Sequence, residues 1–270
     1  MFTSNPFAGL SASIPPAAMQ SYVVLMIVLV AAGTLFEVVH KGSARYFFQN
    51  MRTSKAKRAR ALGGGELVSI AVQTAVVDVL ASGEFCNPRR RIAHLLGMYG
   101  FVLYVLATVV LVFDASASAL WARLWWLGGL MVVVSGTWFW FFIRVDVAAE
   151  GNSPFRVVQA DLFILSLLAS ATLGLLWAAT GGGIGVLFGL YLLATTVLFA
   201  GVPWSKFAHM FFKPAAAFEK RVTRADGTAE NLPTQTRDDP VQQKRHSMEL
   251  LQDAPMDMGL GIKREAPRHY

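Results

Sequence analysis

Five long runs of apolar residues, separated by shorter polar segments, restrict the fold of this chain more than any other feature. A helix rises about 1.5 Å per residue, so about 20 apolar residues cross a hydrocarbon core of about 30 Å. Only 15% of the residues are charged, whereas soluble domains carry about 25%. The sequence therefore predicts an all-α integral membrane protein built as a five-helix transmembrane bundle. The expected spans cover residues 21–40, 92–113, 124–143, 157–179 and 185–212.

The basic residues give the expected orientation. Of 24 Lys and Arg residues, ten lie in residues 41–91, two in residues 144–156 and eleven from Lys206 onward, which leaves Arg123. Cytoplasmic loops carry an excess of Lys and Arg, so we predict an outer N-terminus and an inner C-terminus, in a bacterial inner (cytoplasmic) membrane. In the alternative, residues 66–82 also cross the membrane, and the basic C-terminal segment then lies outside.

Three segments lie outside the predicted bundle. Residues 1–20 are small, polar and proline-rich and form an outer lead before the membrane domain of residues 21–213. Residues 66–82 are too polar and too short to span comfortably, and we expect a cytoplasmic interfacial helix there. Residues 214–270 lack long apolar runs and have few aromatic residues, so they are expected to form a disordered cytoplasmic tail.

The net charge of +7 does not indicate nucleic-acid binding, because the basic residues lie between and after the apolar runs. With one cysteine, Cys86, the chain holds no internal disulfide, iron–sulfur cluster or four-cysteine zinc site. A metal centre in this chain must therefore rely on histidine.

On this topology two histidines lie at matched depth near the inner face. His94 begins the second span, and His209 ends the fifth span beyond Pro203, where we expect a kink. Two such imidazoles can give the two axial ligands of one inner-face haem b, and Gly97 and Gly100 would leave room for the macrocycle. The residues alone leave open that both imidazoles are solvated by lipid headgroups.

Glu37 and His40 end the first span, three residues apart on one helix face. Histidine titrates near neutral pH, and intramembrane carboxylates are often functional. This pair is therefore a candidate quinone site that takes up protons from the cytoplasm. The alternative is that Glu37 pairs with a base of the inner loop and that His40 is solvated.

Two motifs carry a family resemblance. The pattern P-x-S-K-F-x-H at residues 203–209, followed by K-P at 213–214, resembles the last helix of the nitrate reductase gamma-subunit superfamily. The stretch R-R-R-I-A-H-L-L at residues 89–96, with Y-G-F at 99–101, is similar to the second helix of the same group. This superfamily of quinone-interacting membrane cytochromes b also includes subunits of sulfur metabolism, and the chain is most similar to membrane anchor subunits of dissimilatory adenylylsulfate reductase.

The resemblance implies quinone chemistry coupled to a cytoplasmic partner that carries flavin, iron–sulfur or molybdenum centres. His94 and His209 match the ligands of the inner haem in that family. Tyr104 and Tyr191 stand where the ligands of the outer haem would be, so an outer bis-histidine haem is not expected.

We therefore expect an electron-transfer subunit of an oxidoreductase complex rather than a stand-alone enzyme. It would pass electrons from a soluble partner, expected to be adenylylsulfate reductase, through haem b to quinone. A cofactor-free anchor that only holds the soluble enzyme at the membrane is the main alternative. A small-solute transporter is a weaker alternative, because the spans show no pair of broken helices in matching halves.

Overall fold

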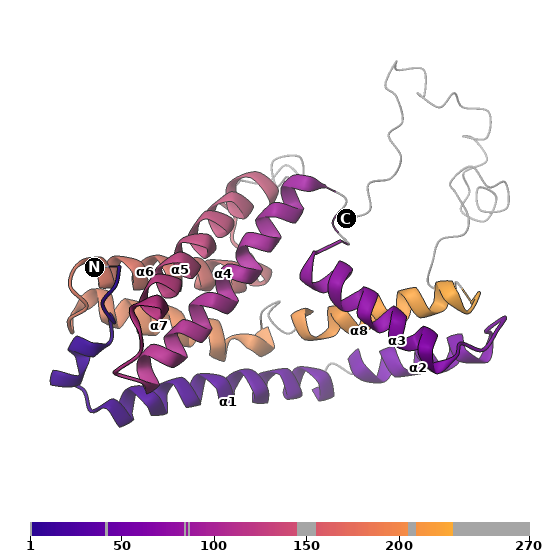
Figure 1. Cartoon of the computed structure of the whole chain (residues 1–270), viewed down its shortest axis with the longest axis horizontal. Helices are drawn as coiled ribbons and strands as arrows, with labels where there is room; N and C mark the ends of the chain where they lie inside the picture. The colour runs from indigo at the N-terminus through magenta and orange to yellow at the C-terminus, as the bar shows by residue number, and fades with distance from the viewer. Residues whose placement is uncertain are drawn as a thin grey trace, which may run out of the picture. The chain divides into compact units, whose positions relative to one another are not determined.

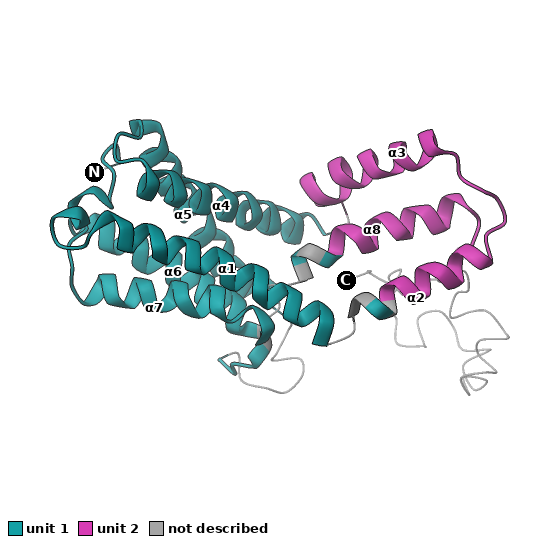
Figure 2. Cartoon of the chain, turned by 90° about the horizontal axis from the view of Figure 1, so that it is seen from below, with its two compact units in different colours: residues 1–45, 87–212 teal, residues 46–86, 213–270 magenta. Residues whose placement is uncertain are grey.

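The computed structural model describes residues 2–40, 43–83, 85, 87–144, 155–204 and 209–228. Regular structure in these residues is helical throughout, and the labelled helices are shown in Figure 1. The chain divides into two compact units (Figure 2). Unit 1 comprises residues 1–45 and 87–212, and unit 2 comprises residues 46–86 and 213–270.

Four helices of unit 1 are long and apolar enough to cross a membrane. They are α1 (Pro16–His40), α4 (Pro88–Phe113), α5 (Ala119–Trp138, which continues as the π-helix Phe139–Ile143) and α6 (Leu162–Ala179). The fifth apolar run forms a shorter helix, α7 (Val186–Ala200). The chain is thus all-helical, with several apolar helices of the kind found in multi-pass membrane proteins. The expected five spans and their orientation remain predictions.

Local sequence signals explain where α4 begins and ends. Asn87 caps the helix, and its side-chain oxygen accepts a hydrogen bond from the Arg89 amide at 2.9 Å, while Pro88 takes the first helical position, where no amide proton is needed. The helix ends before Asp114, whose carboxylate accepts bonds from the Ser116 amide at 2.8 Å and the Ser116 hydroxyl at 2.6 Å. These bonds hold the short turn that leads into α5.

The fifth apolar run differs from the expected kinked span over 185–212. Helix α7 ends at Ala200, a 3₁₀ turn follows at Val202–Trp204, and α8 (His209–Ala225) is a separate helix. Proline lacks the amide proton that would continue the helix at Pro203. Val202 is fully buried, and its side chain packs against Gly33 of α1. The chain therefore ends a helix where a kink was expected.

Aromatic rings fill much of the core of unit 1. Trp125 of α5 and Trp177 of α6 are almost completely buried. The Trp125 indole donates a hydrogen bond to the Thr108 hydroxyl at 2.9 Å, and the Trp177 indole donates one to the Gly183 carbonyl at 2.9 Å. A buried indole usually needs such a partner, so these bonds fix the two rings in place.

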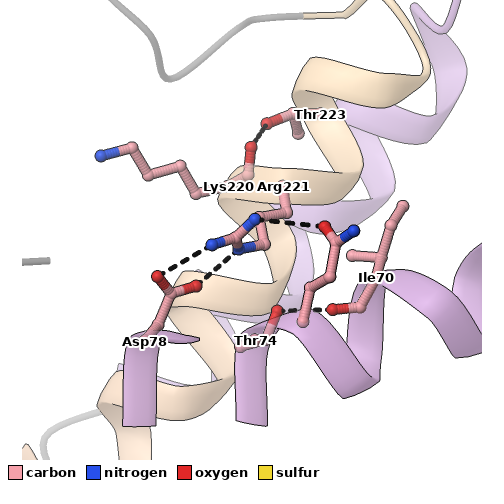
Figure 3. Close-up of polar contacts among 7 residues, drawn as sticks. Ile70, Thr74, Asp78, Lys220, Arg221 and Thr223 are labelled. Carbon is pink, nitrogen blue, oxygen red and sulfur yellow. Dashed lines mark hydrogen bonds and ion pairs between the residues drawn. The ribbon is translucent and has the colours of Figure 1, made fainter. Parts of the chain in front are cut away.

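Unit 2 contains most of α2 (Ser43–Ala56), together with α3 (Gly64–Gln73), the π-helix Thr74–Leu80 and α8 from Lys213. The Ala59 and Arg60 amides donate to the Asp226 carbonyl at 3.0 and 3.1 Å. Arg221 of α8 binds both carboxylate oxygens of Asp78, with contacts of 2.5 and 3.0 Å (Figure 3). These contacts join helices that lie far apart in the sequence.

Two expectations for unit 2 have different outcomes. The helix expected over 66–82 is present as α3 with its π-helical continuation, whereas its position at a membrane surface stays a prediction. The segment expected to be disordered from residue 214 begins as a helix, because α8 continues to Ala225. Residues 229–270 of that segment lie outside the described residues.

Candidate functional site

Unit 1 contains an elongated apolar cavity bounded by α1, α4, α6 and α7. Its volume is about 860 Å³. One face of α1 lines it from Ala18 to Leu35, a length of about 26 Å at about 1.5 Å per residue. Among the described residues that line the cavity, none is Lys, Arg, His, Asp or Glu. The cavity therefore suits a long, uncharged and lipophilic ligand.

Hydroxyl groups provide the polar points of the cavity wall, and most are bonded between or within helices. The Tyr22 hydroxyl lies 2.9 Å from the Thr196 hydroxyl and 3.1 Å from the Leu192 carbonyl, which ties α1 to α7. The Ser170 and Thr195 hydroxyls lie 2.8 Å apart and join α6 to α7. The side chains with hydroxyls that line the cavity are Tyr22, Thr34, Tyr104, Thr108, Ser170, Tyr191 and Thr195.

The structure brings Tyr104 of α4 and Tyr191 of α7 together. Both side chains are buried, and the Tyr191 hydroxyl interacts with those of Tyr104 and Thr108. The Tyr104 hydroxyl is itself enclosed and makes no hydrogen bond of good geometry within the described residues. Leaving such a group unbonded costs about 1–3 kcal/mol. The Thr34 hydroxyl of α1, which also lines the cavity, is likewise enclosed without such a bond among the described residues.

The same two tyrosines occupy the positions that the family resemblance assigns to the outer haem ligands. The Tyr104 ring lies 5.1 Å from the Trp125 ring, and the Tyr191 ring lies 5.8 Å from the Trp177 ring. Gly174 of α6 packs against both tyrosines, and a Cβ atom there would lie 3.0 Å from the Tyr191 ring. Aromatic rings thus fill the space between α4 and α7 at this level.

Neither candidate haem ligand is among the described residues that line the cavity. His94 is exposed near the start of α4, and it lies two helical turns before Phe101, on the same face. Phe101 and Met210 both line the cavity, and Met210 directly follows His209. The His209 side chain lies outside the described part of the chain.

No cluster of three or more His, Cys, Asp or Glu side chains lies in the described part of the chain. A haem iron held by two histidines does not require such a cluster, since the porphyrin supplies the other ligands. The cofactor assignment therefore remains a prediction that depends on His94 and His209.

The structure gives Gly97 and Gly100 a role that differs from the expected room for a macrocycle. A Cβ atom at Gly97 would lie 2.5 Å from the Ser135 oxygen, and one at Gly100 would lie 2.7 Å from the Met131 Cβ atom. The Ser135 hydroxyl also donates to the Ala93 carbonyl at 2.8 Å. Helix α5 occupies the space beside both glycines, so they permit close packing of α4 on α5.

The expected quinone residues lie on the last turn of α1, beyond the end of the cavity lining. Glu37 is half-buried, with one carboxylate oxygen shielded from solvent, and it follows the lining residue Thr34 by three positions. His40 is exposed and stacks on Phe36, with ring centroids 4.9 Å apart. Glu37 therefore adjoins the cavity more closely than His40 does.

Sequence reasoning missed the cavity itself. Only Met26 and Gly33 of α1 are buried, so most of this apolar helix is not covered by the other helices of the unit. One signal was present in the sequence, since Tyr22, Tyr104 and Tyr191 place a polar tip inside three otherwise apolar runs. Their meeting on one cavity wall depends on which helices are neighbours.

Together, these helices and the cavity define an all-helical protein with several apolar helices that could span a membrane, enclosing a lipophilic site. No family model and no solved structure matches the chain. The chain is similar to citrate utilization protein B of Escherichia coli, with 29% identity over 163 residues, which is 55% of this chain and 43% of the relative. The chain thus spans less than half of the length of that protein.

Proposed function

We propose that this chain is a membrane electron-transfer subunit that passes electrons between a cytoplasmic redox enzyme and the quinone pool. The apolar cavity in unit 1 carries the proposal. Its uncharged lining and its length of about 26 Å suit a quinone with an isoprenoid tail. Few other membrane-soluble reactants combine a long apolar tail with a neutral, hydrogen-bonding head.

The residues near the proposed inner end of the cavity suit electron transfer and proton transfer to the quinone. His94 and His209 would hold the iron of one haem b, which supplies one-electron transfer when bound. Glu37 adjoins the cavity and keeps one carboxylate oxygen away from solvent. Such a carboxylate can hold a proton near the quinone, and the exposed His40 side chain can exchange that proton with the cytoplasm.

Unit 2 is a suitable docking surface for a soluble enzyme. Its described part carries more basic than acidic residues, and two of its acids, Asp78 and Glu66, are already paired with Arg221 and Arg60. A basic surface steers an acidic partner. The proposed partner is adenylylsulfate reductase, on the basis of the resemblance carried by the two histidine motifs.

A second candidate concerns the metabolic context. The relative at 29% identity is named for citrate utilization, which favours a membrane role in citrate use. Citrate itself does not suit the cavity, because a trianion needs compensating cations and no described lining residue carries a positive charge. In that context too, the chain would serve as a membrane subunit for a partner enzyme.

The first test is a dithionite-reduced minus oxidised visible spectrum of the full chain, purified in mild detergent from cells that make haem. A b-type α band that is lost in His94→Ala and in His209→Ala, and kept in His246→Ala, is the expected result. A flat spectrum from folded protein would overturn the haem assignment and favour the cofactor-free anchor.

The second test addresses the partner. In vesicles that contain the chain and a quinone, purified adenylylsulfate reductase should reduce the quinone when it is given sulfite and AMP. Vesicles without the chain are the control. Equal quinone reduction in the two preparations would remove the chain from the electron path.

A further inference from the structure

Thr34 of α1 differs from three other threonines in the apolar helices of unit 1. Thr108, Thr195 and Thr196 each donate to the carbonyl four residues earlier, at 2.7–2.8 Å. This bond to the preceding turn is a common way for a threonine inside a helix to satisfy its hydroxyl. The Thr34 hydroxyl is enclosed and makes no hydrogen bond among the described residues. Its proton is therefore not committed to the helix.

Thr34 lies toward the end of the cavity that adjoins Glu37. Among the α1 residues that line the cavity, only Leu35 follows it. Glu37 comes three positions after Thr34, which places both side chains on one face of the helix. Toward the other end of α1, the Tyr22 hydroxyl already contacts the Thr196 hydroxyl at 2.9 Å. Thr34 is therefore the polar lining residue of α1 that is closest to the expected proton donor.

Two phenylalanine rings bound the cavity near the level of Thr34. Phe101 of α4 and Phe199 of α7 both line it, and their ring centroids lie 6.4 Å apart. Both rings pack against the cluster of buried residues that includes Val202, and Val30 of α1 packs against the same cluster. Val30 lies about one helical turn before Thr34. Flat apolar rings beside a hydroxyl with an uncommitted proton suit a planar ring that carries a carbonyl.

We infer that the Thr34 hydroxyl donates a hydrogen bond to one carbonyl of the quinone, with Phe101 and Phe199 beside the quinone ring. This inference rests on the proposed function and adds a binding residue to it. A threonine in a helix uses two χ1 rotamers, so rotation about the Cα–Cβ bond can turn the hydroxyl from its enclosed position toward the ligand. The quinone head then lies about one turn from Glu37, and the isoprenoid tail extends along α1 toward Ala18.

The chemistry of the lining selects a neutral hydrogen-bond acceptor. A quinone carbonyl accepts hydrogen bonds and carries no charge. A fatty-acid or phospholipid head is anionic and would need a compensating cation, and no described lining residue is Lys, Arg or His. A hydrocarbon without oxygen would leave the Thr34 hydroxyl without a partner.

The first experiment titrates the purified full chain in detergent with decylubiquinone by isothermal calorimetry, and micelles without the chain give the heat of partitioning. We expect saturable binding, with Kd raised about 2–10-fold in Thr34→Val, which corresponds to the loss of one net hydrogen bond. Thr34→Ser keeps a hydroxyl and should restore most of the affinity. Thr180→Val is the matched control, because Thr180 is exposed, donates to the Leu176 carbonyl and is absent from the lining. Its Kd should equal that of the unchanged chain.

The second experiment observes the hydrogen bond itself. The infrared band of a carbonyl moves to lower wavenumber when its oxygen accepts a hydrogen bond. Decylubiquinone that is isotope-labelled at one carbonyl at a time should show this shift for one of the two carbonyls on the unchanged chain, relative to the same quinone in dodecane. In Thr34→Val the shift should be lost. Because the unchanged chain already gives a result, the inference stays testable if Thr34→Val does not fold.

The outcomes separate this inference from the proposed function. Saturable binding with an unchanged Kd in Thr34→Val would overturn the inference and leave quinone binding by the chain intact. Equal weakening in Thr34→Ser and Thr34→Val would also overturn it, because the shape of the side chain would then determine the affinity. An unshifted band for both carbonyls on the unchanged chain would have the same meaning. No saturable binding to the unchanged chain would overturn the quinone-binding part of the proposed function itself. Thermal unfolding without ligand identifies the variants that fold.

Discussion

Gly100 of α4 and Gly128 of α5 lie backbone against backbone. A Cβ atom at Gly100 would lie 3.0 Å from the Gly128 carbonyl oxygen, and one at Gly128 would lie 2.8 Å from the Gly100 carbonyl oxygen. Side-chain movement cannot relieve either approach, because the atoms in the way belong to the main chain. This contact fixes the distance between α5 and α4, the helix that carries His94 and Tyr104.

We expect Gly100→Ala to lower the free energy of unfolding by about 1–3 kcal/mol, since the added methyl group overpacks a closed contact. Thermal unfolding in detergent, followed by circular dichroism, measures the change. The matched control is Gly189→Ala on α7, where a Cβ atom meets nothing within 4 Å. That change should be neutral or should stabilise by about 0.5–1 kcal/mol. Equal effects of the two substitutions would contradict the packing role.

The ion pair between Asp78 and Arg221 joins α8 to the π-helix that follows α3 (Figure 3). The Arg221 and Asp78 side chains are 29% and 14% exposed, and the guanidinium binds both carboxylate oxygens. We expect Asp78→Ala to destabilise unit 2 by about 1.5–3 kcal/mol, the range for hydrogen bonds to charged groups. Faster hydrogen exchange of the α8 amides is the measurement.

The exposed pair of Arg60 and Glu66 provides the control for that prediction. Its side chains are 52% and 37% exposed, and exposed pairs contribute about 0–1 kcal/mol. Glu66→Ala should therefore change α8 exchange much less than Asp78→Ala does. If Asp78→Ala leaves α8 exchange unchanged, the Asp78–Arg221 pair does not hold unit 2 together.

Glu219 of α8 should make unit 2 sensitive to pH. Burial raises the pKa of the Glu219 carboxyl, the nearby Asp226 carboxylate adds to the shift, and Lys55 opposes it. The ionised form is disfavoured in the folded state, so stability is lost as the pH rises through the raised pKa. Glu219→Gln should stabilise unit 2 at pH 8 by less than about 1 kcal/mol. This advantage should vanish near pH 4, where the carboxyl is also protonated in the unfolded chain.

Asp114 provides the control for the Glu219 prediction, because its pKa is shifted in the opposite direction. Both variants are measured by thermal unfolding between pH 4 and 8. Hydrogen bonds from Ser116 lower the pKa of the Asp114 carboxyl, so its contribution to stability is present at neutral pH and is lost as the pH falls. Asp114→Asn should therefore destabilise the chain at pH 8. If the stabilisation by Glu219→Gln increased as the pH fell, the pKa of Glu219 would not be raised in the folded chain.

The sequence predicts the apolar helices well, because each run is long enough to decide its own structure. The Asn87-Pro88 start of α4 follows from capping chemistry. The break after Ala200 was expected as a kink, since the effect of Pro203 on a helix depends on what packs there, and the burial of Val202 against Gly33 is a tertiary contact.

The site was less predictable than the helices. A glycine near a histidine indicates equally well a cofactor space or a close helix contact, and only the position of α5 decides for Gly97 and Gly100. The pairing of Asp78 with Arg221 joins residues 143 positions apart and left no local signal. Tyr104 and Tyr191 were singled out by the family resemblance, and their contact depends on the packing of α4 and α7.

The exposed face of α3 leads to the last prediction. Val68, Val72, Val76 and Leu80 recur every four residues and are 51–63% exposed. The row Ile70, Thr74 and Asp78, also spaced by four, lies on the opposite face, where Ile70 and Thr74 are buried and Asp78 binds Arg221. In an α-helix, side chains four residues apart are each displaced a little further around the helix axis, because one turn takes 3.6 residues. The π-helix at Thr74–Leu80 has wider turns, so the displacement there runs in the opposite sense. The valine row therefore stays on one face, as a helix lying on a membrane surface requires.

The single cysteine allows a direct measurement of that face. In a Cys86→Ser background, a cysteine introduced by Val72→Cys is labelled with an environment-sensitive dye and compared with Ala71→Cys, which is exposed about 100° around the helix. In vesicles without any partner, the label at residue 72 should emit further to the blue than the label at 71, and spin-labelled lipids should quench it more strongly. Equal, water-like emission at both positions would place the valine row away from the bilayer and leave it for a protein partner.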